Sequence, residues 1–221
     1  DPDGPMKPLH RMNPLRTGWI AERIARRHGR NPAAPDALAG LALLDVGCGA
    51  GLASEAFARR GAQAGGLDAA GEALLAARTH AAAGGLGIDY REGLPEDLPA
   101  GETFDAVIAL EVIEHVADRH AFLAALARAT KPGGLIFLST LNRTPRAFLL
   151  AKLGAEYLLR LLPVGTHDWK MFVTPAELGT GLNEVGFKVA DIAGMSMDVL
   201  TGRWRATRDV GVNYIVMARG G

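Results

Sequence analysis

The stretch LALLDVGCGAG, residues 41–51, most constrains what this chain can fold into. Its apolar first half suits a buried parallel strand, and LASEAFARR after it has the apolar spacing of a helix. Gly47, Gly49 and Gly51 therefore form the turn between strand and helix. A tight turn without a ligand needs one glycine, whereas alternating glycines let a ligand approach the free backbone N–H groups at a helix start. The stretch predicts a strand–turn–helix unit that binds a nucleotide-like ligand.

Strand-like and helix-like segments alternate along the rest of the chain. The predicted strands are 42–46, 63–68, 87–92, 104–110, 135–141, 187–194 and 212–218, and the predicted helices are 52–60, 71–83, 118–130 and 175–185. This alternation predicts an α/β fold with a Rossmann-like, doubly wound and mostly parallel sheet. Only the loop 195–211 separates the last two strands, so we expect the last strand to be antiparallel. Residues 1–17 and 30–39, rich in Pro and Ala, are expected to be irregular or short helical segments.

Length and composition indicate one globular domain. The 221 residues, 48% of them hydrophobic, can bury one sizeable core. Within a single domain 1–221 we expect an N-terminal cap segment (1–40), a cofactor-binding half (41–144), a helical insertion with its loop (145–173) and the C-terminal half of the sheet (174–221).

The charge balance and the cysteine content limit the partners and the compartment. Lys plus Arg and Asp plus Glu number 24 each, so no net charge attracts nucleic acid, and no nucleic-acid partner is expected. Cys48 is the single cysteine, and no signal peptide or apolar run of membrane-spanning length is present, which predicts a cytoplasmic protein. Cys48 lies inside the glycine turn, either as a reactive thiol or as a small packed side chain.

An acidic residue, Asp68, ends the predicted second strand, seventeen residues beyond Gly51. Ligands of such sheets bind at the carboxyl ends of the strands, where a carboxylate accepts hydrogen bonds from ribose hydroxyls. An adenosine-containing ligand is therefore predicted. The dinucleotide motif G-x-G-x-x-G fails in both registers, since Leu52 and Ser54 stand where glycine is needed, and no Lys-Ser/Thr pair of a P-loop follows.

The pattern D-V-G-C-G-x-G, the acid ending the second strand and KPGG before the fifth resemble the class I S-adenosylmethionine-dependent methyltransferases. Longer motifs are similar to the O-methyltransferases of ubiquinone biosynthesis, and this resemblance covers nearly the whole chain. They are KPLHRMNPLRTGWI (7–20), LEVIEHV (110–116), STLNRT (139–144), GAEYLLRLLPVGTHDWKMFVTPAEL (154–178) and GVNYIVMA (211–218).

The resemblance implies S-adenosyl-L-methionine as cofactor, with Arg16, Gly47, Asp68 and Leu110 binding it. Each residue type suits this task. Gly47 lets the backbone approach the methionine moiety, Asp68 accepts from the ribose, and Leu110 offers an apolar contact near the sulfonium. Arg16 is a permanent cation able to bind a carboxylate in bidentate fashion.

The motif LEVIEHV carries the candidate catalytic residues, Glu111 and His115, together with Glu114. If a helix begins at 111, the spacing i, i+3, i+4 places all three on one face. They could then hold a divalent cation such as Mg²⁺ that lowers the pKa of a catechol hydroxyl. Alternatively His115 is the general base, with a carboxylate setting its tautomer. In a third interpretation the glutamates are ordinary residues of a polar first helical turn.

The acceptors implied by the resemblance are polyprenylated ubiquinone precursors with a catechol-type hydroxyl, namely a polyprenyl dihydroxyphenol and a related demethylubiquinol. The segment 146–163 is more apolar than a surface helix and too short to span a bilayer. It could be buried, line a tunnel for the tail, or lie on a membrane surface, which would make the protein peripheral on the inner face of the membrane. His167 and Asp168 form a second candidate pair on the loop after it.

Two other functions remain as alternatives. One is an O-methyltransferase of a small soluble phenol. The other is a non-catalytic S-adenosylmethionine-binding module in a complex with other quinone-biosynthesis enzymes.

Overall fold

The computed structural model describes residues 7–148, 171–198 and 201–221. One eight-stranded sheet runs through them in the order β3-β2-β1-β4-β5-β8-β6-β7. The strands are β1 Ala42–Val46, β2 Gln63–Asp68, β3 Asp89–Glu92, β4 Phe104–Leu110, β5 Thr130–Leu141, β6 Phe187–Met197, β7 Trp204–Thr207 and β8 Asn213–Gly220. Strands β1 to β5 pair in parallel, whereas β8 is antiparallel to both β5 and β6. The predicted mostly parallel sheet with an antiparallel last strand is confirmed.

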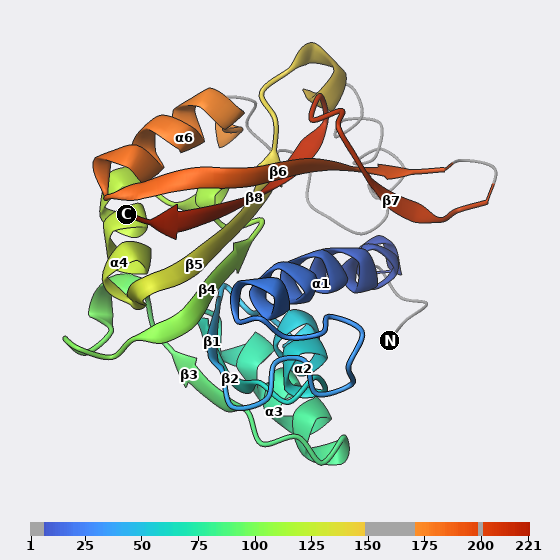
Figure 1. Cartoon of the computed structure of the whole chain (residues 1–221), viewed down its shortest axis with the longest axis vertical. Helices are drawn as coiled ribbons and strands as arrows, with labels where there is room; N and C mark the ends of the chain where they lie inside the picture. Colours follow the sequence, from blue (N-terminus) through green and yellow to red (C-terminus); the bar gives the residue numbers. More distant parts are fainter. Residues whose placement is uncertain (1–6, 149–170, 199–200) are drawn as a thin grey trace.

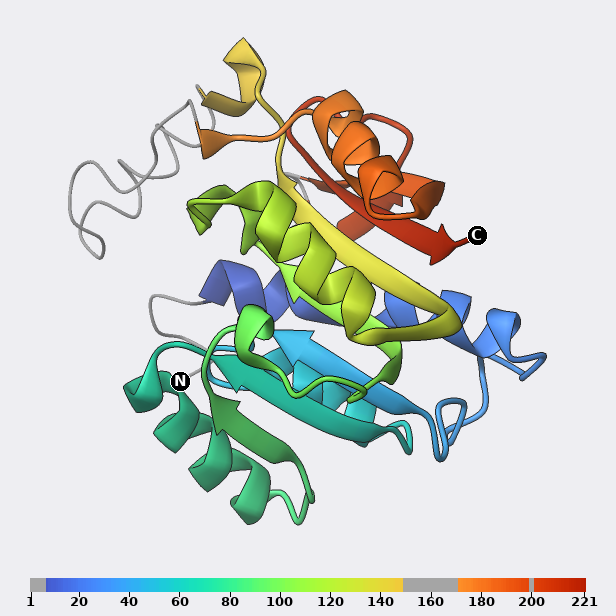
Figure 2. The same cartoon turned by 90° about the vertical axis from the view of Figure 1, so that its left-hand side faces the viewer.

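Helices cover both faces of this sheet, as predicted for a doubly wound fold. They are α1 Lys7–Arg27, α2 Leu52–Ala58, α3 Gly71–Ala83, α4 Arg119–Arg128 and α6 Pro175–Glu184, with short 3₁₀ turns η1 Pro95–Asp97 and η2 Ile113–His115. Figure 1 shows α1, α2 and α3 on one side of the sheet and α4 and α6 on the other. The view in Figure 2, turned by 90°, shows α4 and α6 lying over the sheet surface.

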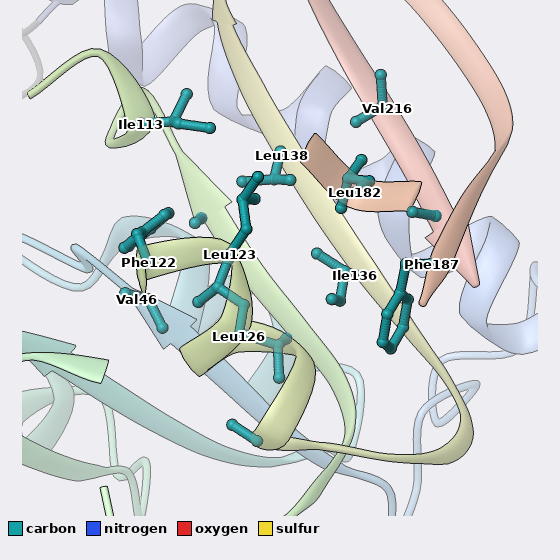
Figure 3. Close-up of a cluster of buried hydrophobic side chains, with 14 of the residues drawn as sticks. Val46, Ile113, Phe122, Leu123, Leu126, Ile136, Leu138, Leu182, Phe187 and Val216 are labelled. Carbon is teal, nitrogen blue, oxygen red and sulfur yellow. The ribbon is translucent and has the colours of Figure 1, made fainter. Parts of the chain in front are cut away.

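Successive buried side chains of the central strands alternate between the two faces of the sheet, and the core therefore has two layers. Val107 and Ala109 of β4 pack with the helices α4 and α6, whereas Ala106 and Ile108 pack with α1 and α2. Successive side chains of a strand point to opposite faces, so one strand supplies both layers. Figure 3 shows part of the first layer, with Leu123 of α4 labelled among its side chains. Burial on both faces explains why the central strands read as continuous apolar runs.

The N-terminal segment departs from the sequence prediction. The expectation of irregular or short helical structure is wrong for residues 7–17, because α1 is a single helix of 21 residues. Pro14 lies inside it and removes one helical N–H donor. Packing compensates, since Trp19, Ile20 and Ile24 of the same helix are buried against the sheet. A helix whose stability comes from tertiary burial is not visible in its local propensities.

The expected loop 195–211 also contains structure that the sequence did not reveal. Its first residues continue β6, and residues 204–207 form β7, which pairs with β6 from Gly194 to Met197. Charged residues interrupt the apolar pattern of RWRAT, so the strand signal there is weak.

Most of the predicted insertion lies outside the described residues, which stop at 148 and resume at 171. The prediction of a helix over 146–163 therefore stays a prediction beyond residue 148, and the pair His167 and Asp168 also lies outside the described residues. Among the helices that the structure describes, none combines the length and apolar character needed to cross a membrane.

Candidate functional site

The glycine turn lies at the carboxyl end of β1, between the neighbouring strands β2 and β4. Gly47, Gly49 and Gly51 all adopt positive φ, at 69°, 51° and 81°. Residues other than glycine rarely adopt this left-handed backbone conformation. A Cβ atom on Gly47 would come 2.4 Å from Val112 Cγ2, and one on Gly51 would come 2.1 Å from the Tyr90 hydroxyl. The alternating glycines are thus required by backbone conformation, and two of them also by close packing.

Asp68, at the end of β2, lies against this turn. Its Oδ2 accepts a hydrogen bond from Gly49 N at 2.7 Å, and its Oδ1 accepts one from Ala70 N at 2.8 Å. Each carboxylate oxygen has further lone pairs, so both can still accept from a ligand. The structure therefore joins the predicted acid to the predicted turn.

Asp45, the last acid before the turn, was not singled out from the sequence. It is buried, and its Oδ2 accepts a hydrogen bond of 2.6 Å from Ser54 Oγ of α2. Burial raises the pKa of Asp45 to about 6, although the Ser54 hydrogen bonds and the nearby Arg16 cation oppose this shift. The signal in the sequence was an acidic residue two positions before the first glycine. In the structure, the Asp45 carboxylate links β1 to the first turn of α2 through Ser54.

Arg16, from α1, is a buried cation at the same edge of the sheet. Only 8% of its side chain is exposed, and its Nη1 lies 3.6 Å from Glu111 Oε1. Its Nε and Nη1 have no hydrogen-bond partner among the described residues. Buried guanidinium donors are rarely left unpaired, so these atoms mark a place where an anionic ligand can bind.

The loop after β4 begins at Glu111, directly beyond Leu110. Glu111 has a φ of +57°, a left-handed conformation that no other non-glycine residue shares in the part of the chain that the structure describes. Its Oε1 accepts a hydrogen bond of 2.7 Å from Ser139 Oγ, and its N donates to Ser139 O at 3.0 Å. The premise of a helix beginning at 111 is therefore wrong, because residue 111 is left-handed and only 113–115 form a 3₁₀ turn.

The predicted metal set does not assemble in this structure. Glu114 is buried and accepts from Thr140 Oγ1 at 2.9 Å, whereas His115 is exposed. Across residues 7–148, 171–198 and 201–221, no group of three or more His, Cys, Asp or Glu side chains is placed to hold a metal ion. The physical reason is the left-handed Glu111, which breaks the helical spacing on which the set of Glu111, Glu114 and His115 depended.

Two carboxyl groups nevertheless interact in this loop. Burial, and then the neighbouring charge of Glu111, raise the pKa of Glu114 well above its ordinary range. A buried carboxyl group beside a second carboxylate does not ionise readily, so Glu114 favours its protonated form. Ser139 and Thr140, the hydroxyl partners at the end of β5, were not singled out from the sequence, although polar residues ending a buried strand were a visible signal.

Cys48 has the structural role rather than the reactive one. It is buried and packs with Leu74, Ala77 and Tyr90. Burial, together with the nearby acids Asp45 and Asp68, raises the pKa of its thiol far above the ordinary range. A thiol that stays protonated is a poor nucleophile.

Comparison with known proteins agrees with this geometry. The family model of a methyltransferase domain matches residues 44–138. The ubiquinone biosynthesis O-methyltransferase of Methylobacterium sp. (strain 4-46) is 49% identical over 219 residues, covering 99% of this chain and 88% of that protein. The protein of the same description in Azorhizobium caulinodans is 46% identical over 220 residues, covering 99% and 87%.

Solved structures of methyltransferases share the fold. The magnesium protoporphyrin IX methyltransferase of Synechocystis PCC 6803, solved with bound SAH, matches with a TM-score of 0.67 at 23% sequence identity. The match covers 95% of this chain and 84% of that one. This likeness supports the Rossmann-like architecture.

A first prediction compares two glycines of the turn. Gly47→Ala and Gly49→Ala both place a side chain at positive φ, but only the former meets an atom, Val112 Cγ2 at 2.4 Å. We expect Gly49→Ala to lower the free energy of unfolding by about 1–2 kcal/mol, the cost of a left-handed residue. Gly47→Ala should cost more, because Val112 must also move. Urea unfolding measures both losses.

Val112→Ala provides the control for this comparison. Added to Gly47→Ala, it should recover part of the lost stability. Added to Gly49→Ala, it should recover none. Equal losses in the two alanine variants, or no recovery, would contradict the steric argument.

A second prediction concerns pH. The pKa of Asp45 is about 6 when folded and 3.8 ordinarily, so between these values the folded protein holds a proton that the unfolded chain has released. The free energy of unfolding therefore falls as pH rises through this window, by up to about 3 kcal/mol. Asp45→Asn should remove this fall in the free energy of unfolding, so the variant should gain stability relative to the original chain as pH rises. Urea unfolding from about pH 4 to about pH 7 tests it.

Ser54→Ala is the matched control, because losing the hydrogen bond that lowers the pKa of Asp45 should raise this pKa further and extend the decline to higher pH. An unchanged slope in Asp45→Asn would show that Asp45 does not titrate in this range.

Proposed function

The chain belongs to the family of ubiquinone biosynthesis O-methyltransferases and is an S-adenosylmethionine-dependent enzyme; from this premise we propose that it methylates a catechol hydroxyl of a polyprenylated phenol. The observation that supports the proposal most is the buried, unpartnered guanidinium of Arg16 beside Glu111. It supplies the charge needed for the carboxylate of an amino-acid-bearing cofactor, at the edge of the sheet where such folds bind their ligands.

The residues present fit S-adenosylmethionine. Arg16 would bind its carboxylate, and the backbone at Gly47 would approach its methionine moiety. Asp68 would accept from its ribose, and Leu110, half-buried at the end of β4, would contact it near the sulfonium. When bound, this cofactor supplies an activated methyl group on sulfur.

The remaining chemical requirement is a base. A phenol has a pKa of about 10, so its deprotonation at neutral pH must be favoured by about 4 kcal/mol. We assign the proton to His115, an exposed side chain in η2 directly after Glu114. His115 would accept the proton of the phenol hydroxyl as that oxygen takes the methyl group, which the cofactor, when bound, would supply from its sulfur.

Glu111 has a positioning role in this proposal. Its carboxylate lies within ion-pair distance of Arg16 and also accepts from the Ser139 hydroxyl, so it links the cofactor end of the site to β5. A group that holds Arg16 in place should affect the affinity for S-adenosylmethionine, whereas a group confined to proton transfer should not. Glu111 and His115 are thereby assigned different tasks.

The third prediction tests His115. His115→Ala should lower kcat on a farnesylated catechol by about 10²–10⁴-fold, the usual contribution of a general base, while calorimetry shows unchanged affinity for S-adenosylmethionine. Glu111→Gln should instead weaken that affinity. His28→Ala, which changes another exposed histidine, is the matched control and should keep full activity.

Several outcomes would change the assignment. Full activity of His115→Ala would remove His115 as the base. Loss of activity in chelator, restored by Mg²⁺, would show that a metal ion performs the role assigned to His115. Equal activity on a tail-less catechol would favour a small phenol as acceptor, and tight cofactor binding without turnover would favour a non-catalytic module.

We further infer that the segment 146–163 brings the protein to a membrane surface that holds the prenylated acceptor. Phe148, the last described residue before the gap, is 39% exposed. Arg143 and Arg146 beside it are each paired with an acid, Glu177 and Asp209. Apolar contact rather than these two charges is therefore expected to supply most of the affinity.

The fourth prediction is that the protein sediments with liposomes containing anionic lipid. Replacing Phe148, Leu150 and Leu153 by serine should abolish sedimentation, because the apolar contact area is lost. Arg143→Gln combined with Arg146→Gln is the control and should reduce binding only slightly. Sedimentation that survives the triple serine replacement would place the membrane contact elsewhere.

A further inference from the structure

A groove of about 460 Å³ lies between α4 and α6, on the face of the sheet opposite α1. Its lining is mostly apolar and comprises Ile113, Leu123, Val173, Ala176, Leu178 and Gly181. Arg119, His120, Glu177, Thr180 and Glu184 complete it. The volume and the apolar lining are typical of pockets that bind small ligands.

One end of the groove adjoins the site described above. Ile113 opens η2 and lies between Glu111 and Glu114 in the sequence. Val173, which also lines the groove, donates to Leu141 O at the end of β5. The carbonyl of Val173 accepts from the Tyr214 hydroxyl at 2.9 Å. The groove therefore starts at the carboxyl ends of β4 and β5, the same edge that carries Glu111.

Two charged side chains of the lining are already engaged within the protein. Arg119 Nη2 donates to Met171 O at 2.6 Å, and Glu177 accepts from Thr174 N at 2.9 Å in the capping box of α6. Neither group needs a charge from a ligand. An occupant whose surface is apolar suits such walls better than an ionic one.

A glycine of α6 lets this helix pack directly against Leu123 of α4, beside the groove. A Cβ atom on Gly181 would come 2.8 Å from Leu123 Cδ1, so a larger residue there would force the leucine to move. Glycine is unfavourable inside a helix, and its presence in α6 favours close approach over helix stability.

We propose that this groove binds the apolar tail of the acceptor, in its first prenyl units next to the catechol ring. The proposal rests on the function proposed above, since it needs an acceptor that carries such a tail. The ring would lie at the end marked by Ile113, and the tail would run between α4 and α6 toward Thr180 and Glu184. No charged group is required for recognition along this path.

The test fills the groove from the exposed residue Thr180. Thr180→Trp should lower kcat/KM for a farnesylated catechol at least about tenfold, the effect of losing contacts worth one or two buried methylenes, mainly through KM. For the same catechol with a methyl group in place of the farnesyl chain, kcat/KM should stay within about twofold. Asn183→Trp is the matched control, because Asn183 is an exposed residue of the same helix that does not line the groove.

Equal losses on the two acceptors, or no loss on either, would overturn the proposal. A second measurement does not depend on whether a variant folds, because it uses the unaltered chain. This chain is irradiated with a farnesylated catechol that bears a diazirine on its second prenyl unit. Adducts on peptides from 119–123 and 176–184 are expected, and adducts confined to 146–163 would place the tail elsewhere. If the unaltered chain methylates neither catechol, the proposed function fails, whereas methylation of both without these adducts refutes the groove alone.

Discussion

The buried cation of Arg16 is the interaction on which the arrangement of the site depends. A guanidinium with 8% exposure needs compensating charge, because removing it from water costs several kcal/mol. Glu111 supplies part of that charge at 3.6 Å, and Asp45 another part, since the Arg16 cation opposes the rise in the pKa of Asp45. The protein leaves Nε and Nη1 without partners among the described residues, so this compensation is incomplete. An anionic ligand would complete it.

The same cation links the N-terminal helix to the sheet. Arg16 can reach this position only because Trp19 and Ile20 dock α1 on the sheet, and its partner Glu111 is held left-handed by two hydrogen bonds to Ser139. Backbone strain of this kind persists when the surrounding contacts determine it, and it is common at functional sites. Stability of the site and docking of α1 are therefore coupled.

Local patterns allowed much of the fold to be predicted, and the candidate site was predictable by residue type more than by geometry. Glycines at every second position and the boundaries of the central strands follow from short-range rules of backbone conformation and burial. The helix over residues 7–17 could not be predicted, because Pro14 argues against it locally and only packing on the sheet stabilises it. The spacing from Glu111 to His115 predicts one helical face, whereas Glu111 is left-handed and accepts a hydrogen bond from Ser139 of β5. A pattern within residues 111–115 contains no information about a contact with β5.

The geometry of methyl transfer gives the two faces of the sheet different tasks. In a displacement at the methyl carbon, the attacking oxygen and the departing sulfur must lie on opposite sides of that carbon. Arg16 reaches the site from α1 on one face, whereas the groove with Ile113 and Leu123 opens between α4 and α6 on the other. If cofactor and acceptor bind as proposed, they approach from different faces and meet at the loop after β4. A polar ligand and an apolar tail can then each be bound by walls of matching character without sharing an entrance.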